Sequence, residues 1–218
     1  MYCCKCGRKI QNDAKFCPVC GNKLALQEEL TIVLDGKTMT AMDLTQYCLE
    51  RRYFGFEGLK WESMKKNVFN QFRIFFGNII QDMQNDETPL LCFMGEYNKE
   101  SILENGGLRA FLLTDKRLIS SSWFDKILSW KSLFDWSVSW KSRSEKTPRC
   151  ALFSIYIRDL MSVEPTMIRG CDAITFHKVD GDFYVRFFCY NTTHALCDQI
   201  NGILRQLREK GTPESRKG

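Results

Sequence analysis

Four cysteines near the start of the chain have the type and spacing of a metal site. Residues 3–10 and 17–24 both read C-x-x-C-G-x-K followed by Ile or Leu, so this segment contains a short internal repeat. Two thiolates three positions apart can reach one ion when the chain turns between them, and the glycine that follows accepts the positive φ that such a turn often needs. Four thiolates in a tetrahedron form a closed structural zinc site without an open position for substrate. We therefore expect one structural Zn2+ ligated by Cys3, Cys6, Cys17 and Cys20.

The repeat also identifies Cys4 as the cysteine that is left over, because only Cys3 gives the first turn the same two-residue gap as the second. Free thiols or disulfides are the alternative interpretation. A paired C-x-x-C in a cytosolic chain is more typical of zinc. A module of about 24 residues buries too little apolar surface to fold alone, so the metal would supply the folding free energy.

The spacing and flanks of the second cysteine pair resemble the short four-cysteine zinc ribbons at the N-termini of many bacterial proteins, and the matching residues are Phe16, Cys17, Pro18, Cys20, Gly21 and Leu24. The resemblance implies a structural or protein-contact accessory at residues 1–24. This segment carries five Lys or Arg residues and only Asp13 as an acid. Contact with nucleic-acid phosphates is one interpretation of that charge. A solvated surface is the interpretation we favour, because no aromatic stacking pair accompanies the lysines.

Composition is that of an ordinary folded protein. The chain has 218 residues, of which 44% are hydrophobic and 26% charged, with a net charge of +5. This length suits one good-sized core with an appendage, or two modest domains. The mild positive charge permits contact with phosphate or anionic lipid without requiring it. No signal-peptide pattern or membrane-spanning apolar stretch is apparent, so we expect a cytoplasmic protein whose membrane role, if it has one, is peripheral.

Residues 25–88 are expected to form a helical connector between the ribbon and a C-terminal domain. An extended piece at 30–34 and a turn at Asp35-Gly36 precede a predicted helix over 40–52. A second, longer helix follows that piece and ends before the polar stretch at 84–89, which we take as the domain boundary.

The longer helix is predicted over 59–83, where apolar residues recur at helical intervals and charged residues interleave with them. The pattern fits one amphipathic helix, or two with a bend at Gly77. We expect the apolar face to pack on the C-terminal domain, because an apolar stripe at helical spacing is more often core than interface. Lying on a membrane or pairing with a partner are the alternatives.

The C-terminal domain is expected to span residues 89–210 and to consist of antiparallel strands followed by one helix, with a flexible tail at 211–218. An Asp180-Gly181 turn predicts a hairpin. The expected elements are strands at 90–97, 108–114 and 117–123, a longer extended region at 151–165, strands at 173–179 and 183–190, and a helix at 193–210.

This order of elements resembles the bacterial pleckstrin-homology-like domains, including the related GRAM-like group. The pieces that carry the resemblance are LTDKRLI at 113–119, IYIRDLMSV at 155–163 and the Phe-rich strand at 183–188. The resemblance implies an α+β protein whose antiparallel barrel or sandwich is capped by its C-terminal helix. Such folds host many unrelated functions, so the resemblance alone does not identify a ligand.

The connection before the extended region at 151–165 is longer than a usual hairpin loop and holds four of the five tryptophans. Trp and Lys together suit a bilayer interface, where indoles lie at the headgroup level and lysines meet anionic lipid. Filling a core or an oligomer contact is the commoner role of large aromatic residues. The candidate membrane or partner contacts are Trp123, Trp130, Trp136, Trp140, Lys131 and Lys141.

No enzyme motif stands out. His194 and Cys197 are three positions apart in the last predicted helix, which is a suitable spacing for a metal pair or a thiol-imidazole dyad, but nothing else in the sequence supports either. An ordinary surface or packed histidine is the simpler interpretation. We expect the cysteines outside the ribbon to be small buried hydrophobic residues; they are Cys48, Cys92, Cys150, Cys171, Cys189 and Cys197.

The sequence therefore favours a non-enzymatic binding or scaffold protein, in which a zinc ribbon is joined to a pleckstrin-homology-like domain that binds a protein segment or an anionic membrane surface. The alternative is a nucleic-acid-associated regulator that uses the basic ribbon together with Arg205, Arg208 and Arg216.

Overall fold

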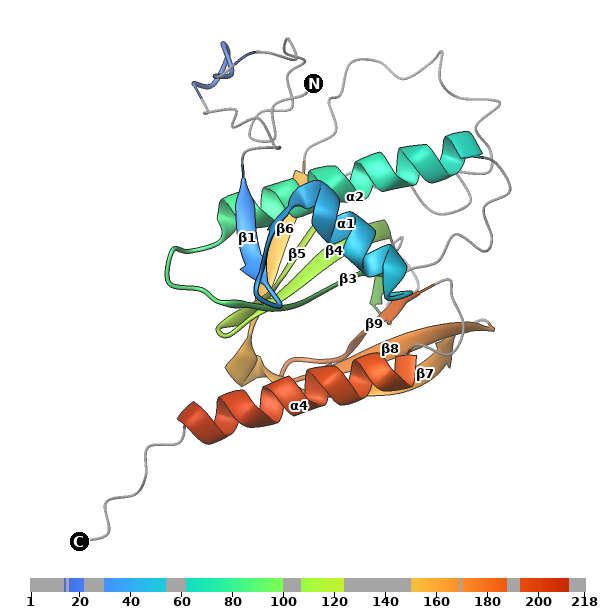
Figure 1. Ribbon diagram of the computed structural model, residues 1–218. Helices are drawn as coiled ribbons and strands as arrows, with labels where there is room; N and C mark the ends of the chain where they lie inside the picture. The colour runs from blue at the N-terminus through green and yellow to red at the C-terminus, as the bar shows by residue number, and fades with distance from the viewer. Residues whose placement is uncertain are drawn as a thin grey trace, which may run out of the picture.

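The computed structural model describes residues 14, 16–21, 30–53, 62–99, 107–123, 150–168, 170–187 and 193–211. These residues form an α+β structure with a seven-stranded antiparallel sheet and a separate two-stranded hairpin (Figure 1). In chain order the elements are β1 (Thr31–Leu34), β2 (Lys37–Thr40), α1 (Ala41–Glu50), α2 (Glu62–Asp82), β3 (Pro89–Lys99), β4 (Gly107–Thr114), β5 (Arg117–Trp123), β6 (Cys150–Tyr156), η1 (Ile157–Asp159), β7 (Leu160–Ile168), β8 (Cys171–Lys178), β9 (Phe183–Arg186) and α4 (Thr193–Gly211).

The strands of the large sheet lie in the order β6-β5-β4-β3-β9-β8-β7, and every neighbouring pair is antiparallel. Two runs of consecutive strands, β3 to β6 and β7 to β9, meet where β3 pairs with β9. The α+β class and the antiparallel sheet are thus confirmed. The expected barrel is corrected to an open sheet, because the end strands β6 and β7 do not pair with each other within the described ranges. An open and a closed sheet have the same alternation of side chains, so the sequence pattern does not separate them.

A short 3-10 turn, η1, carries the chain from one end of this sheet to the other. The sequence predicted a single extended region over 151–165, whereas β6 ends at Tyr156 and β7 begins at Leu160. Ile157 within the turn and Leu160 after it are both buried. The corner is marked by the burial of these two side chains. Residues 156–161 contain no glycine or proline. Turn signals in the sequence therefore missed it.

The predicted Asp35-Gly36 turn is confirmed and joins β1 to β2. Asp35 has a φ of 52° and Gly36 a φ of 72°, and positive φ at both positions is what a type I′ hairpin turn requires. The sequence did not predict β2, because this strand is only four residues long and runs directly into α1. Thr40 is both the last residue of β2 and the N-cap of α1.

A capping box begins α1. The Thr40 hydroxyl accepts a hydrogen bond from the Asp43 backbone N–H at 3.2 Å, and the Asp43 carboxylate accepts one from the Thr40 N–H at 2.8 Å. These bonds to the backbone and side chain of Thr40 hold the pKa of Asp43 below its ordinary value of 3.8. The box therefore contributes stability above pH 3.8 and loses it as the pH falls through the lowered pKa of Asp43.

We expect Asp43→Asn, which removes a negative charge from the first turn of α1, to lower the free energy of unfolding by about 0.3–1 kcal/mol at pH 7. The difference from the wild-type protein should stay constant down to about pH 5 and shrink below the ordinary Asp43 pKa of 3.8, because the wild-type carboxylate is then protonated. Urea unfolding followed by circular dichroism at several pH values measures this difference. A difference in the free energy of unfolding that grows as the pH falls would contradict the role of the Asp43 carboxylate in the capping box.

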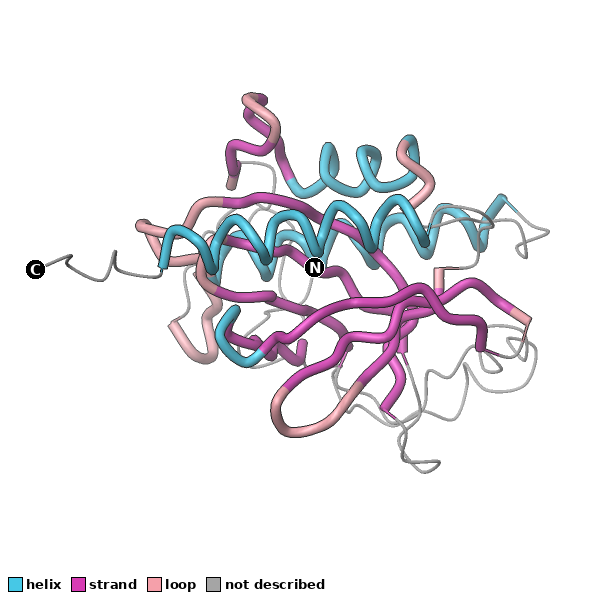
Figure 2. Tube along the Cα trace, turned by 90° about the horizontal axis from the view of Figure 1, so that it is seen from below, coloured by secondary structure: helices cyan, strands magenta, loops and turns pink. Residues whose placement is uncertain are grey.

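Two long helices pack against the large sheet: α2 contacts β4 and β5, and α4 contacts β7 and β8. The sheet lies between them in Figure 1, and Figure 2, seen from below, shows α4 running in front of the strands toward the C-terminus. The expected packing of the amphipathic 59–83 stripe on the C-terminal sheet is confirmed. The helix is continuous through Gly77, so the single-helix alternative is correct.

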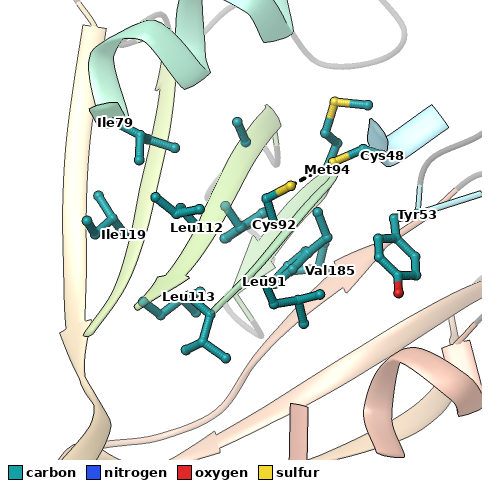
Figure 3. Close-up of a cluster of buried hydrophobic side chains, with 14 of the residues drawn as sticks. Cys48, Tyr53, Ile79, Leu91, Cys92, Met94, Leu112, Leu113, Ile119 and Val185 are labelled. Atoms are coloured by element: carbon teal, nitrogen blue, oxygen red, sulfur yellow. Dashed lines mark hydrogen bonds between the residues drawn. The ribbon is translucent and has the colours of Figure 1, made fainter. Parts of the chain in front are cut away.

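The centre of the sheet is buried on both faces. Side chains alternate along a strand, yet Leu91, Cys92, Phe93 and Met94 of β3 are all fully buried, so each face of β3 has a cover. Figure 3 shows the cluster around Cys92, into which α1, α2 and the sheet all contribute side chains. Aromatic rings fill the other face, where Phe93 stacks on Phe111 with ring centroids 4.8 Å apart.

Gly95 lies in β3 beside the point where β9 begins to pair. A Cβ atom at this position would come within 2.2 Å of Val185 Cγ1 and 2.7 Å of the Arg186 carbonyl oxygen. The backbone of β9 must move to admit a methyl group, so we expect Gly95→Ala to lower the free energy of unfolding by about 1–3 kcal/mol. Gly107→Ala, where nothing lies within 4 Å, is the matched control. Equal urea midpoints for the two variants would contradict the close approach.

Candidate functional site

The second cysteine pair of the candidate zinc ribbon forms a tight turn. The Gly21 N–H donates to the Cys17 carbonyl oxygen at 2.9 Å, and Gly21 has a φ of 67°. This is the positive φ that the sequence predicted for the glycine after C-x-x-C. The Cys17 side chain is only 1% exposed, and Cys20 is half-buried. The turn thus has the backbone geometry that lets two thiolates three positions apart approach one ion.

The other half of the ribbon, including Cys3, Cys4 and Cys6, lies outside the described residues. Within the described ranges no group of three or more His, Cys, Asp or Glu side chains could hold a metal ion. Those ranges contain two of the four expected ligands, so a four-cysteine site stays a prediction. The Cys17–Gly21 turn fits such a site, because it supplies soft sulfur donors at the required spacing.

The tryptophan-rich connection joins two neighbouring strands. Trp123, the last residue of β5, is the cross-strand partner of Cys150, the first residue of β6, so the connection leaves and re-enters the sheet at one place. The other candidate contacts in it lie outside the described residues; they are Trp130, Trp136, Trp140, Lys131 and Lys141. Among the described helices, none is long and apolar enough to cross a membrane.

His194 and Cys197 both lie on α4 but differ in exposure: His194 is exposed, whereas Cys197 is 2% exposed. Burial raises the pKa of the Cys197 thiol to about 12, with smaller contributions from Asp198 and Glu164. A thiol with such a pKa is neutral near pH 7 and is a poor nucleophile or metal ligand. The arrangement of this pair supports the interpretation of His194 as an ordinary surface histidine and of Cys197 as a buried apolar residue. Cys48 and Cys92 are also fully buried, as expected, whereas Cys171 is only half-buried, so the prediction is wrong for that residue.

A polar cluster that the sequence did not predict surrounds His177 on β8. Its Nδ1 atom lies 2.9 Å from an Asp182 carboxylate oxygen, and its Nε2 atom lies 3.3 Å from Glu164 on β7. The antiparallel register brings these residues together, since Glu164 pairs with Thr175 two positions before His177. Carboxylates occupy both ring nitrogens, so neither faces an open position for substrate. The cluster joins β7 to the β8–β9 hairpin.

The residues of the LTDKRLI motif hold a turn against the end of α2. The Thr114 hydroxyl accepts hydrogen bonds from the backbone N–H groups of Lys116, at 3.2 Å, and Arg117, at 3.0 Å. Thr88 and Asp115 exchange two bonds: the Thr88 N–H donates to the Asp115 carboxylate, and the Asp115 N–H donates to the Thr88 carbonyl oxygen. These polar residues therefore have a structural role, linking β4–β5 to residues 82–88.

Arg117 is the centre of this link. Its Nε donates to Glu87 Oε1 at 2.6 Å, and its Nη1 lies 3.1 Å from Asp82 Oδ2. Its Nη2 donates to the Asp82 carbonyl oxygen, the last residue of α2, at 3.0 Å. The Arg117 side chain is 11% exposed and that of Glu87 1% exposed. A buried charge pair of this kind fixes the end of α2 to the sheet.

The end strand β6 presents an exposed row of side chains. Leu152, Ser154 and Tyr156 alternate along the strand and are all exposed, Leu152 at 43% and Tyr156 at 51%. The Arg158 guanidinium lies over the Tyr156 ring, 5.1 Å from its centroid. β6 pairs with β5 along one side, and no other described strand pairs with its second side. Unpaired backbone groups at such an edge can accept another strand.

Comparisons with known proteins do not place the chain in a family. No family model matches the sequence. No curated protein matches it significantly.

Proposed function

We propose that the protein is a non-enzymatic binding protein, in which a zinc ribbon at 1–24 and a connector at 25–88 precede a pleckstrin-homology-like domain at 89–210. The ligand is a protein segment in extended conformation, which adds as a strand alongside β6. The proposed location is the cytoplasm, and the proposed role of the zinc is structural.

The observation that carries this proposal is the exposed row on the end strand β6. Both faces of β3 are buried, so the centre of the sheet has no side chains to offer a ligand. At β6, by contrast, Leu152 and Tyr156 are exposed on one face of a strand whose second side is unpaired within the described ranges. Main-chain hydrogen bonds then supply affinity, and alternate side chains of the added segment meet this row.

The opposite end strand, β7, is a poorer acceptor. It contains Pro165, which has no N–H to donate to an added strand. Proline on an end strand is a common device against unwanted strand pairing. The two ends of the sheet therefore differ, and the difference favours β6 as the binding edge.

The order of elements supports the pleckstrin-homology-like assignment, because a run of antiparallel strands followed by one amphipathic helix is what the resemblance implies. Residues 89–186 supply all seven strands of the large sheet, and α4 follows them. α2 and Arg117 attach part of the proposed connector to the sheet. An anionic membrane or a nucleic acid is the competing ligand, and the experiment below separates them.

The test begins with selection of peptides from a displayed random library on the full-length protein, followed by anisotropy titration of a selected peptide. We expect Leu152→Glu and Tyr156→Glu each to weaken binding by about tenfold or more, because each replaces an apolar side chain of the exposed row by a charged one. The control is Met167→Glu, since Met167 is 70% exposed but lies on β7. Equal loss in all three variants would contradict the β6 edge.

Vesicles of phosphatidylcholine with phosphatidylserine, and duplex DNA at two salt concentrations, serve as the competing probes. Sedimentation with the vesicles that survives both β6 substitutions would overturn the proposal in favour of a membrane surface. DNA retention that falls steeply with salt would instead support the nucleic-acid-associated alternative.

The zinc assignment predicts one zinc per chain in protein purified from rich medium, measured by plasma mass spectrometry. Cys17→Ser should lose this metal, because a tetrahedral structural site needs all four thiolates. Cys4→Ser is the matched control: it has the same chemistry and lies next to an expected ligand, and it should keep the zinc. If Cys4→Ser lost the zinc and Cys3→Ser kept it, the ligand would be Cys4 and the assignment of Cys3 from the repeat would be wrong.

A further inference from the structure

Two buried cysteines from distant parts of the sequence lie side by side. Cys48 is in the last turn of α1 and Cys92 is in β3, and their Sγ atoms are 3.5 Å apart (Figure 3). Both side chains are fully buried. Neither residue belongs to the zinc ribbon or to the β6 edge, so the proposed function leaves this pair unexplained.

The backbone around Cys48 is fixed by the way α1 ends. The Tyr53 N–H donates to the Cys48 carbonyl oxygen at 2.8 Å, and the Arg52 N–H donates to that of Leu49 at 3.0 Å. Arg52 has a φ of 58°, and together with these two hydrogen bonds this makes the C-terminus of α1 a Schellman motif. These bonds fix the backbone of Cys48, and its buried side chain lies against that of Cys92 in β3.

A second tie holds the same end of α1 to the β1–β2 turn. The Tyr47 hydroxyl donates to the Asp35 carboxylate at 2.6 Å, and the Arg51 guanidinium lies 3.1 Å from the same oxygen. These bonds join α1 to its own hairpin and not to the large sheet, so α1 can leave β3 together with the hairpin once the packing around Cys48 opens. Local opening of this kind is less costly than global unfolding.

The separation of the sulfurs is close to what a disulfide needs. A disulfide bond is about 2.05 Å long, so the atoms must approach by about 1.5 Å. In the closed state burial raises the pKa of the Cys48 thiol, and the neighbouring Cys92 raises it further. The Cys48 thiol is then neutral and both sulfurs are shielded from solvent, so an oxidant must reach the pair while α1 is open.

We infer that Cys48 and Cys92 are a redox modification site, at which a peroxide converts the two thiols into a disulfide that joins α1 to β3. One cysteine thiolate attacks a peroxide oxygen, the O–O bond breaks and a sulfenic acid forms, with hydroxide leaving as water after protonation. The second sulfur then attacks the sulfenic sulfur, the S–O bond breaks and a second water leaves. Two thiols and one hydrogen peroxide thus give one disulfide and two waters.

The disulfide would make the opening of α1 unfavourable. It links residues 44 positions apart, with α2 in the intervening chain. A covalent link between such distant positions restricts the unfolded and partly opened chain more than the closed one. Oxidation should therefore slow amide hydrogen exchange in α1 and raise the thermal midpoint of the whole protein.

The experiment treats the full-length, zinc-loaded protein with hydrogen peroxide, blocks remaining thiols under denaturing conditions and maps tryptic peptides by mass spectrometry. We expect peptide 38–51 to be found joined to peptide 74–99, and treatment with a reductant to release both. Cys48→Ala should abolish the joined species, whereas Cys197→Ala, which removes a buried thiol of α4, should leave it unchanged. The inference is overturned if Cys48 and Cys92 still carry the blocking reagent after the other cysteines have oxidised. Disulfides that join either residue to a different cysteine would also overturn it.

The role of α1 opening has its own test. Thr40→Ala removes the capping box that begins α1, and we expect it to accelerate formation of the joined peptide several-fold, as a cap contributes to helix stability. The rate should rise in step with amide exchange in α1. Equal rates in the two proteins would contradict opening as the route by which the oxidant enters.

Discussion

Replacing Arg117 with alanine is expected to lower the free energy of unfolding by about 3–5 kcal/mol. The reason is that the substitution leaves Glu87 buried without its cation. The Glu87 side chain is only 1% exposed, and its carboxylate accepts a hydrogen bond from the Arg117 Nε at 2.6 Å. Without the guanidinium, a buried carboxylate loses its cation, and the carbonyl oxygen of Asp82 loses its donor. Urea unfolding followed by tryptophan fluorescence and far-ultraviolet circular dichroism measures the change.

Lys116→Ala is the matched control for that prediction. Lys116 is the next residue along and is paired with Asp86, but 38% of its side chain and 72% of that of Asp86 are exposed. An exposed pair contributes about 0–1 kcal/mol. Similar losses in the Arg117 and Lys116 variants would show that the link between α2 and the sheet does not depend on the buried pair.

Phe93→Ala is expected to cost about 3–5 kcal/mol through the cavity it creates. Phe93 lies at the meeting point of both halves of the sheet: its ring stacks on Phe111 of β4, and on Phe176 of β8 with centroids 5.8 Å apart. It is fully buried. Because one ring contacts strands from both halves, its removal should lower the stability of α2 and α4 together, in a single transition.

The control for Phe93 is Val179→Ala, since Val179 is 71% exposed and its truncation should change stability by less than about 0.5 kcal/mol. If β3 to β6 and β7 to β9 unfolded in separate transitions in the Phe93→Ala variant, a shared core would be contradicted. Hydrogen exchange resolved by element distinguishes one transition from two.

Features that depend on residues close together in the chain were predicted well from the sequence. The Asp35-Gly36 turn, the start of a helix near Thr40 and the positive φ of Gly21 each depend on residues that are neighbours in the chain. The amphipathic pattern of α2 also indicated its packing on the sheet correctly.

Features that depend on distant residues were not predicted. The corner at η1 is made by buried apolar residues, and the openness of the sheet depends on whether its end strands meet. The Cys48–Cys92 pair and the His177 cluster each join different elements. In these cases residue types were visible in the sequence, but their neighbours in space were set by the antiparallel register and by the packing of α1. The exposed row on β6 became recognisable only when the strand order placed β6 at the end of the sheet.

Amide hydrogen exchange across residues 150–156, with and without a peptide selected on the full-length protein, is the most direct measurement of the proposed binding edge. Strand addition predicts that the peptide slows exchange in β6, because amides on the side that no described strand pairs with gain hydrogen bonds, while β7 and α4 stay unchanged. A bound peptide that leaves the exchange of β6 unaltered and protects another element would contradict the account.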